Sequence, residues 1–385
     1  MAAGPILARG LGPEARGEFA LALAVYALAT SLGNFGQAER LAADLRDQST
    51  SPREGPRYFI AVSASLIAAV CAFIALRTID VDHGTSLAVA LAVPVASLGF
   101  MWRALAISRG RTLLVAAQPA VPAVLRLAAL AALFYSGCLT LFGATALTML
   151  ATSIGFLTIY WRLKVSQTPA ALIPIPKTSS ESKFLTDLKT GLVQGLPVVG
   201  FNLNSFVIFR ADIFMLNAIS TRDQLGLYAA AVALTEASWA ASTAFKNRMQ
   251  AAAYTARPRE KIRRELTVML LLSLPVVLVC ELFARQLTVI MFGESFSGAV
   301  PVMRILLVTA IALMIFDCGQ GLLAVFGQRR AMFSTTAVGA VITVAALWIL
   351  IPRFGAVGAA LASLCAYSAV GVASWTIAFK VGPRD

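Results

Sequence analysis

Residues Arg210 to Glu236, RADIFMLNAISTRDQLGLYAAAVALTE, combine charged residues in an apolar setting, a polar turn and a second copy of the start of the chain. Placing Gly226 over Gly17 aligns TRDQLGLYAAAVA with GPEARGEFALALA. In both copies an acid lies three residues before the glycine and an aromatic residue lies two after it, and an alanine-rich apolar run follows. The sequence therefore predicts one helix–turn–helix unit that is used twice.

The composition places the chain in a membrane. Its mean hydropathy is +0.79, 58% of its residues are hydrophobic and only 13% are charged, whereas charged residues make up about a quarter of soluble domains. We therefore expect an all-α, polytopic membrane protein. The formal net charge of +13 is carried between long apolar runs, so its partners are the membrane lipids rather than nucleic acid.

Neither a cofactor nor a metal is predicted. The five cysteines are scattered without CxxC spacing, and the single histidine, His83, cannot form a zinc site by itself. The sequence holds no nucleotide-binding glycine loop and no HExxH motif. The loops between the apolar runs are also too short for an active site on the outer face. These features favour a transporter over an enzyme such as a membrane-bound sugar polymerase.

A helix needs about 20 apolar residues to cross a bilayer, and eleven stretches of the sequence meet this requirement. A short fragment, residues 1–8, precedes them. We interpret it as the end of a first helix whose beginning is missing through a late start codon or a truncated gene. About twelve transmembrane helices are therefore expected, the first of them truncated. The eleven spans lie near residues 17–37, 58–77, 86–107, 112–135, 139–161, 189–219, 225–245, 265–288, 300–326, 331–351 and 355–379.

Lysines and arginines gather in alternate loops, which the positive-inside rule assigns to the cytoplasm together with the C-terminus. The longest loop contains a proline- and serine-rich stretch that is typical of a linker. We therefore predict an N-terminal lobe of residues 1–165, a cytoplasmic linker of residues 166–188 and a C-terminal lobe of residues 189–385. A second repeat, between Ser108–Phe134 and Gly327–Leu350, favours two six-helix lobes related by an axis along the membrane normal.

Several charged and polar residues lie inside the predicted spans, where a charge costs at least ~2.5 kcal/mol. Arg126 lies in the middle of its span, and Pro119 and Pro122 are expected to kink that helix around a cavity. Arg103 and Arg304 lie nearer the ends of theirs, where snorkelling to the interface explains them equally well. The candidate substrate-binding residues are Arg126, Arg210, Arg103, Arg304, Asn202 and Asn204.

Three acids are also deep in the spans: Asp212, Glu236 and Asp317. Each is either one half of an interhelical salt bridge with an arginine or a protonatable coupling site. Asp212 is two residues from Arg210, which puts the two on different faces of one helix, so we expect Asp212 to have a partner on another helix. Glu281 lies four residues before Arg285, and we expect these two to form an interfacial ion pair.

Arginines that line a cavity suit a phosphate-bearing substrate, because guanidinium binds phosphate through a planar fork and stays charged at any relevant pH. An isoprenoid pyrophosphate with attached sugars has this chemistry, with its polar head in the cavity and its tail in lipid. Because the cell interior is negative, outward movement of the anion is downhill by ~2.3 kcal/mol per charge per 100 mV. Exchange with protons or sodium is compatible with this mechanism but is not required.

Four motifs resemble those of a known family. They are ARGLGPEARGEFALALA (Ala8–Ala24), its second copy after Asp212, FGESF (Phe292–Phe296) and LIPRFGAVGAALAS (Leu350–Ser363). Their order and spacing are similar to those of bacterial polysaccharide and O-antigen (Wzx-like) flippases. Those proteins belong to the multidrug, oligosaccharidyl-lipid and polysaccharide (MOP) exporter superfamily.

The resemblance implies a bacterial inner-membrane flippase that moves an undecaprenyl-pyrophosphate-linked oligosaccharide from the cytoplasmic to the outer leaflet by alternating access. Such a protein serves the synthesis of O-antigen, lipopolysaccharide or exopolysaccharide, and its implied partners are a polysaccharide polymerase and chain-length machinery. The alternative is a cation-coupled small-molecule or drug exporter of the same superfamily, whose cavity would favour acids and aromatic residues over arginines. A peptidoglycan-precursor flippase is a further alternative, although such proteins typically have fourteen spans.

Overall fold

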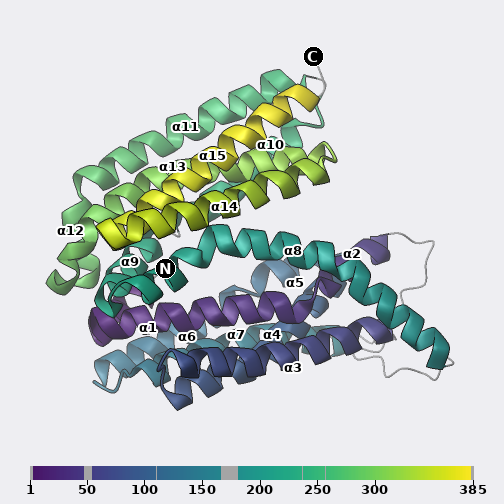
Figure 1. Ribbon diagram of the computed structural model, residues 1–385, viewed down its shortest axis with the longest axis horizontal. Coiled ribbons are helices and arrows are strands. Elements are labelled where there is room, and N and C mark those ends of the chain that lie inside the picture. Colours follow the sequence, from purple (N-terminus) through teal and green to yellow (C-terminus); the bar gives the residue numbers. More distant parts are fainter. Residues whose placement is uncertain are drawn as a thin grey trace. The chain divides into compact units, whose positions relative to one another are not determined.

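Every secondary-structure element that the structure describes is a helix, and all but one short 3-10 helix are α-helices (Figure 1). The predicted all-α fold is therefore confirmed. The proline- and serine-rich part of the predicted linker, residues 166–180, lies outside the described residues. The computed structural model describes residues 3–46, 54–109, 111–165, 181–235, 237–255 and 257–382.

Ten helices in these ranges are long and apolar enough to cross a membrane, and each coincides with one of the eleven predicted spans. The exception is the predicted span at 225–245. It is divided between α9 (Arg222–Thr235) and α10 (Ala237–Ala252), which are too short to cross a membrane singly. Glu236, between them, lies outside the described residues. The described part of the chain thus supplies ten candidate spans and this helix pair, against about twelve predicted helices.

The helices form two compact units, and two helices contribute to both units. Unit 1 comprises Met1–Ala20 and Asn204–Asp385, and unit 2 comprises Leu21–Leu203. The first part of α1 (Ala3–Asn34) belongs to unit 1 and its second part to unit 2, whereas α8 (Glu181–Ile219) passes from unit 2 into unit 1. The division into an N-terminal and a C-terminal lobe on either side of the linker stays a prediction.

Unit 2 has a core of aromatic and aliphatic side chains between its long helices. Tyr58, Trp102 and Phe156 are buried in this core. The Trp102 ring centroid lies 4.9 Å from that of Tyr160. Besides its parts of α1 and α8, the unit consists of α2 (Gln37–Arg46), α3 (Glu54–Thr78), α4 (His83–Ser108), α5 (Thr112–Ala117), α6 (Ala120–Tyr135) and α7 (Leu141–Val165).

The span that contains Arg126 is broken where its prolines predict a kink. Gln118 and Pro119 separate α5 from α6. Proline has no backbone N–H and therefore cannot continue the helical hydrogen-bond ladder. One turn further on, Pro122 lies against Gly155 of α7, with its Cγ 3.0 Å from the position that a Cβ on Gly155 would take.

Unit 1 is built around α13, which packs against α15 and α10, while α14 packs against α15 (Figure 1). Gly358, Ala362 and Ala366 are buried, at the small-residue spacing that favours close helix contacts. The Trp375 indole N–H donates to the Ile315 carbonyl oxygen at 2.8 Å. The further helices of the unit are α11 (Pro258–Leu282), α12 (Ala284–Phe292), the 3-10 helix η1 (Glu294–Ala299), α13 (Val300–Val325), α14 (Arg329–Phe354) and α15 (Ala356–Val381).

The turns that the sequence predicts are present in both copies of the repeat. Gly12 has a φ of 76° and interrupts the helical conformation of α1. In the second copy Ser220 and Thr221 separate α8 from α9. Ala8 of the first copy is buried in the same cluster as Ala230 of the second.

The two copies contact each other inside unit 1 through the glycines that align. A Cβ on Gly226 would overlap the Pro13 carbonyl oxygen, and a Cβ on Gly17 would lie 2.7 Å from the Arg222 carbonyl oxygen. Pro13 and Arg222 are themselves aligned, since each lies four residues before its glycine. The contact is therefore reciprocal, and only glycine allows the backbones to approach so closely. The Arg222 guanidinium also forms an ion pair with the Glu18 carboxylate beside it.

We expect Gly226→Ala to destabilise the protein. Alanine is favoured over glycine in a helix by about 1 kcal/mol, but overlap with the Pro13 carbonyl forces the backbones apart at a cost of about 1–3 kcal/mol. Thermal unfolding of the purified protein in detergent would measure the effect. The matched control is Gly4→Ala, because a Cβ there meets the Ala233 Cβ at 3.6 Å and the Phe292 Cε1 at 4.0 Å, both ordinary contacts. Equal melting temperatures for the two variants would contradict the interpretation.

Candidate functional site

Unit 1 contains a pocket between α8, α9, α10, α13 and α15. Its empty space, including the part open to its surroundings, is about 420 Å³. Two predicted site residues line it, and aromatic and hydroxyl-bearing side chains form most of the remainder. The lining residues of this unit 1 pocket are Phe209, Arg210, Asp212, Tyr228, Val232, Thr235, Ser238, Trp239, Leu306, Thr309, Ala310, Leu313, Ser363 and Tyr367.

Asp212 is buried and is held in the unit 1 pocket by hydrogen bonds. The Tyr228 hydroxyl donates to its Oδ2, and the backbone N–H of Ile213 donates to its Oδ1 at 2.8 Å. The partner on another helix is thus a phenol of α9 rather than an arginine. Because burial of a polar group is costly unless it is hydrogen-bonded, these donors account for a carboxylate at this depth.

Aromatic rings surround Arg210. Its guanidinium carbon lies 5.9 Å from the centroid of the Trp239 ring, within the range of a cation–π interaction. The Phe209 ring centroid is 5.3 Å from that of Trp239 and 5.6 Å from that of Tyr367. The pocket therefore combines one built-in cation, one carboxylate and a set of aromatic faces.

A second polar group lies further along α10 and α13. The Ser242 hydroxyl donates to Asp317 at 2.6 Å, and the Gln250 amide donates to the Gly321 carbonyl oxygen at 3.1 Å. The stem of Lys246 lies across Gly321. Lys246 directly follows the predicted span 225–245, but the residue is helical and half-buried, because α10 continues beyond the apolar run that defines the span.

Gln320 connects three helices of unit 1. Its amide nitrogen donates to the hydroxyl of Thr335 on α14 at 2.9 Å and to the hydroxyl of Ser374 on α15 at 2.8 Å. Its amide oxygen is buried and has no donor among the described residues. Hydrogen bonds in a low-dielectric interior are strong, so this residue fixes α13 against its two neighbours.

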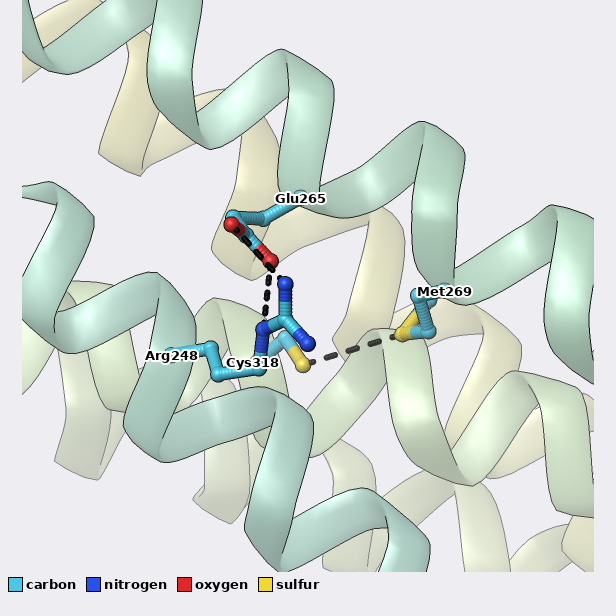
Figure 2. Close-up of polar contacts among 4 residues, drawn as sticks. All are labelled: Arg248, Glu265, Met269 and Cys318. Carbon is cyan, nitrogen blue, oxygen red and sulfur yellow. Dashed lines mark hydrogen bonds and ion pairs between the residues drawn. The ribbon is translucent and has the colours of Figure 1, made fainter.

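Beyond Lys246, Arg248 of α10 forms an ion pair with Glu265 of α11, with 2.7 Å between Nε and the carboxylate oxygen (Figure 2). In the same view the Cys318 thiol of α13 lies 3.9 Å from the Met269 sulfur of α11. The Arg248 side chain is 55% exposed, and exposed pairs contribute only about 0–1 kcal/mol. The two contacts connect α11 to α10 and α13, the helices that carry the second polar group, but they are not part of that group.

In unit 2, Arg126 lies on the side of α6 that faces α7. The residues on this side follow one another at intervals of four: Gln118, Pro122, Arg126 and Leu130. Gln118 and Pro122 contact Gly155 of α7. Leu130 is fully buried. The Arg126 Nε is also buried and has no acceptor among the described residues. Because buried donors are almost always satisfied, this nitrogen is available to an acceptor that the described residues do not supply.

The remaining predicted substrate-binding residues are distributed over both units. Arg103 and Asn202 are half-buried in unit 2. Asn204 belongs to unit 1, and its amide nitrogen is buried without an acceptor among the described residues. Of the predicted acids, Asp212 and Asp317 belong to unit 1, and Glu236 lies outside the described residues.

Arg304 is exposed on α13, and its guanidinium lies 3.9 Å from the Glu281 carboxylate. The predicted partner of Glu281 was Arg285, and the structure corrects this. Phe283 separates α11 from α12, so Glu281 and Arg285 lie on two different helices. The spacing of four residues brings two side chains together only within one continuous helix.

Binding is the chemistry that the arrangement supports. The unit 1 pocket offers hydroxyls, a carboxylate, a guanidinium and aromatic faces, and unit 2 offers the Arg126 guanidinium. Among the described residues, no three His, Cys, Asp or Glu side chains come together in a group that would hold a metal ion.

The sequence analysis does not identify four residues of unit 1. Three of them, Tyr228, Trp239 and Tyr367, line the unit 1 pocket, and the fourth, Lys246, belongs to the second polar group. Tyr228 does appear in the sequence comparison, but only as the aromatic residue that follows Gly226 in the repeat. Trp239 and Tyr367 lie in apolar helices, where an aromatic side chain is typical of packing. The sequence does contain a pattern that could have identified Lys246. It lies four residues from both Ser242 and Gln250, which puts the three polar side chains on one face of a helix.

The fold is similar to that of several solved membrane transporters. A multidrug resistance transporter of the MATE family in an inward-facing conformation has a TM-score of 0.71 and 17% identity, over 98% of this chain and 93% of its own. The lipid II flippase MurJ in an inward closed conformation has a TM-score of 0.73 and 11% identity, over 99% and 84%.

A third similar structure is a MOP superfamily transporter from Pyrococcus furiosus, described by the reverse polarity of its binding pocket. Its TM-score is 0.59 and its identity 18%, over 98% of this chain and 90% of its own. No family model and no curated protein matches the sequence. At identities this low, the likeness defines the fold and leaves the substrate open.

We expect Tyr228→Phe to reduce stability by about 1–3 kcal/mol, because the buried Asp212 carboxylate loses a hydrogen-bond donor. Thermal unfolding of the purified protein, followed by intrinsic fluorescence, would measure this loss. Tyr367→Phe is the control: it removes a hydroxyl from the same pocket that forms no hydrogen bond with the described residues. If Tyr367→Phe lowers the melting temperature as much as Tyr228→Phe does, the Asp212–Tyr228 bond is not the cause.

Proposed function

We propose that this chain is a membrane transporter that moves an undecaprenyl-pyrophosphate-linked oligosaccharide from the cytoplasmic to the outer leaflet by alternating access. The product serves the synthesis of a surface polysaccharide such as O-antigen or exopolysaccharide. The membrane is the bacterial inner membrane, and the C-terminus is cytoplasmic, as the distribution of lysine and arginine indicates. A polysaccharide polymerase and chain-length machinery are the proposed partners.

The observation that carries the proposal is the buried Nε of Arg126, which has no acceptor among the described residues. Arg126 lies within the apolar span Leu113–Tyr135, so a charge is retained there at a cost of several kcal/mol. A cation with an unused donor favours an anionic ligand, and guanidinium binds phosphate through two parallel hydrogen bonds. A diphosphate head group supplies both the charge and the acceptors.

The fold is compatible with this substrate class. One protein of the same fold is a lipid II flippase, and its substrate is a lipid. Another is a multidrug resistance transporter, so the fold by itself supports a lipid-linked substrate and a drug equally well.

The alternative function is cation-coupled export of a small molecule or drug. The unit 1 pocket favours it in one respect, since a buried carboxylate, Asp212, lies among the aromatic rings of Tyr228, Trp239 and Tyr367. Aromatic faces and a carboxylate are typical of sites for organic cations. The two functions therefore differ in the charge of the ligand that the protein binds.

Reconstitution in liposomes tests the proposal. A fluorescent undecaprenyl-pyrophosphate sugar is placed in the membrane, and the fraction that becomes accessible to a quencher outside is followed over time. We expect Arg126→Ala to slow translocation about ten- to a hundredfold, the loss of about 1.5–3 kcal/mol from one charged hydrogen bond. Arg126→Lys should recover only part of the rate, because ammonium has no planar fork.

The control is Arg353→Ala, which removes an exposed guanidinium in the last turn of α14 and should transport as the wild type does. Wild-type transport by Arg126→Ala would show that Arg126 does not bind the diphosphate. A wild-type protein that translocates no lipid diphosphate, but expels methyltriphenylphosphonium from the same liposomes, would establish the exporter instead.

A further inference from the structure

We infer that the unit 1 pocket is a carbohydrate subsite, in which one pyranose ring of the transported oligosaccharide stacks on Trp239. The inference rests on the proposed function, because it assigns one part of that substrate to one part of the protein. It is carried by three observations: the aromatic platform, the cation already placed on it, and the hydrogen-bonding state of the hydroxyls around it.

Trp239 supplies the platform. Its side chain is 41% exposed although it lines a pocket inside a helical unit, and Phe209 supports the ring from 5.3 Å. One face of a pyranose carries several C–H bonds with slightly positive hydrogens. Because the face of an aromatic ring is negative, the C–H face of a pyranose is attracted to the indole ring by both dispersion and electrostatics.

Arg210 distinguishes a sugar from an organic cation. Its guanidinium lies over one face of the Trp239 ring, with 5.9 Å from the guanidinium carbon to the ring centroid, so a ligand cation would have to bind beside a like charge. Arg210 is also only two residues from Asp212 in the sequence. A second cation in this pocket would meet a like charge at the aromatic face, whereas a neutral ring would not.

The hydroxyls distinguish a sugar from a phosphate. Thr235, Ser238 and Thr309 line the pocket, and each donates its hydrogen to a backbone carbonyl of its own chain segment. Their oxygens are therefore left to act as acceptors, and so is the Asp212 carboxylate. Acceptors repel a phosphate and attract O–H groups. A ligand that suits this pocket is therefore neutral, carries several hydroxyl groups and can stack on an aromatic ring, and a sugar ring has all three properties.

The test is a binding measurement on the full chain in nanodiscs. The probes are farnesyl diphosphate without a sugar and farnesyl diphosphate carrying glucose, galactose or N-acetylglucosamine. We expect at least one sugar to tighten binding to the wild type about two- to tenfold, the range for one aromatic contact of about 0.5–1.5 kcal/mol. Trp239→Ala should lose that gain and keep the affinity for farnesyl diphosphate, and Trp239→Phe should keep part of the gain.

The matched control is Trp348→Ala, which removes an indole that is 68% exposed on α14 and outside the pocket. It should bind every probe as the wild type does. A sugar-dependent gain that survives in Trp239→Ala, or that no sugar produces in the wild type, overturns the inference while the proposed function stands. Absence of binding of every farnesyl diphosphate to the wild type overturns the proposed function itself.

A second arm uses methyltriphenylphosphonium and Arg210→Gln. If Arg210 excludes cations from the aromatic face, the wild type should bind this cation weakly and Arg210→Gln several-fold more tightly, whereas loss of a purely structural contact would not increase any affinity. Tight binding to the wild type that Trp239→Ala abolishes would show that the pocket takes cations, and the carbohydrate assignment would be wrong.

Discussion

Polar groups inside hydrocarbon have to find their partners within the protein, and the helix contacts of unit 1 follow from that constraint. The hydrogen bond from Tyr228 to Asp212 joins α9 to α8, and the bond from Ser242 to Asp317 joins α10 to α13. Gln320 joins α13 to α14 and α15 in the same way. Apolar packing alone would allow these helices to slide or rotate against one another, whereas each buried hydrogen bond specifies one register.

The two units differ in the polar groups that they offer to a ligand. In unit 1 the hydroxyls of Thr235, Ser238 and Thr309 donate to backbone carbonyls, so their oxygens remain as acceptors beside the aromatic rings of the pocket. In unit 2 one of the buried groups without a partner among the described residues is a charged donor, the Nε of Arg126. A diphosphate would find a cation in unit 2, whereas an organic cation would find the Asp212 carboxylate and aromatic faces in the unit 1 pocket.

Hydropathy predicted the helices well, because a run of about 20 apolar residues has one stable conformation in lipid. The break near Gln118 and Pro119 was equally visible, since proline removes a hydrogen-bond donor wherever it occurs. Two kinds of feature were not predictable. The extent of α10 was hidden because a helix does not end where its apolar run ends, and so the predicted span stopped at residue 245, just before Lys246. The pairing of Asp212 with Tyr228, and of Arg210 with Trp239, depends on how separate helices rotate toward each other.

The contact between Gly17 and Gly226 has a consequence for how this chain varies over evolutionary time. Each glycine is seated against the backbone four residues before the other, which is the self-complementary contact that two identical subunits form across a two-fold axis. The two positions therefore constrain each other, so that a side chain acquired at one of them would have to be accommodated by a backbone shift at the other.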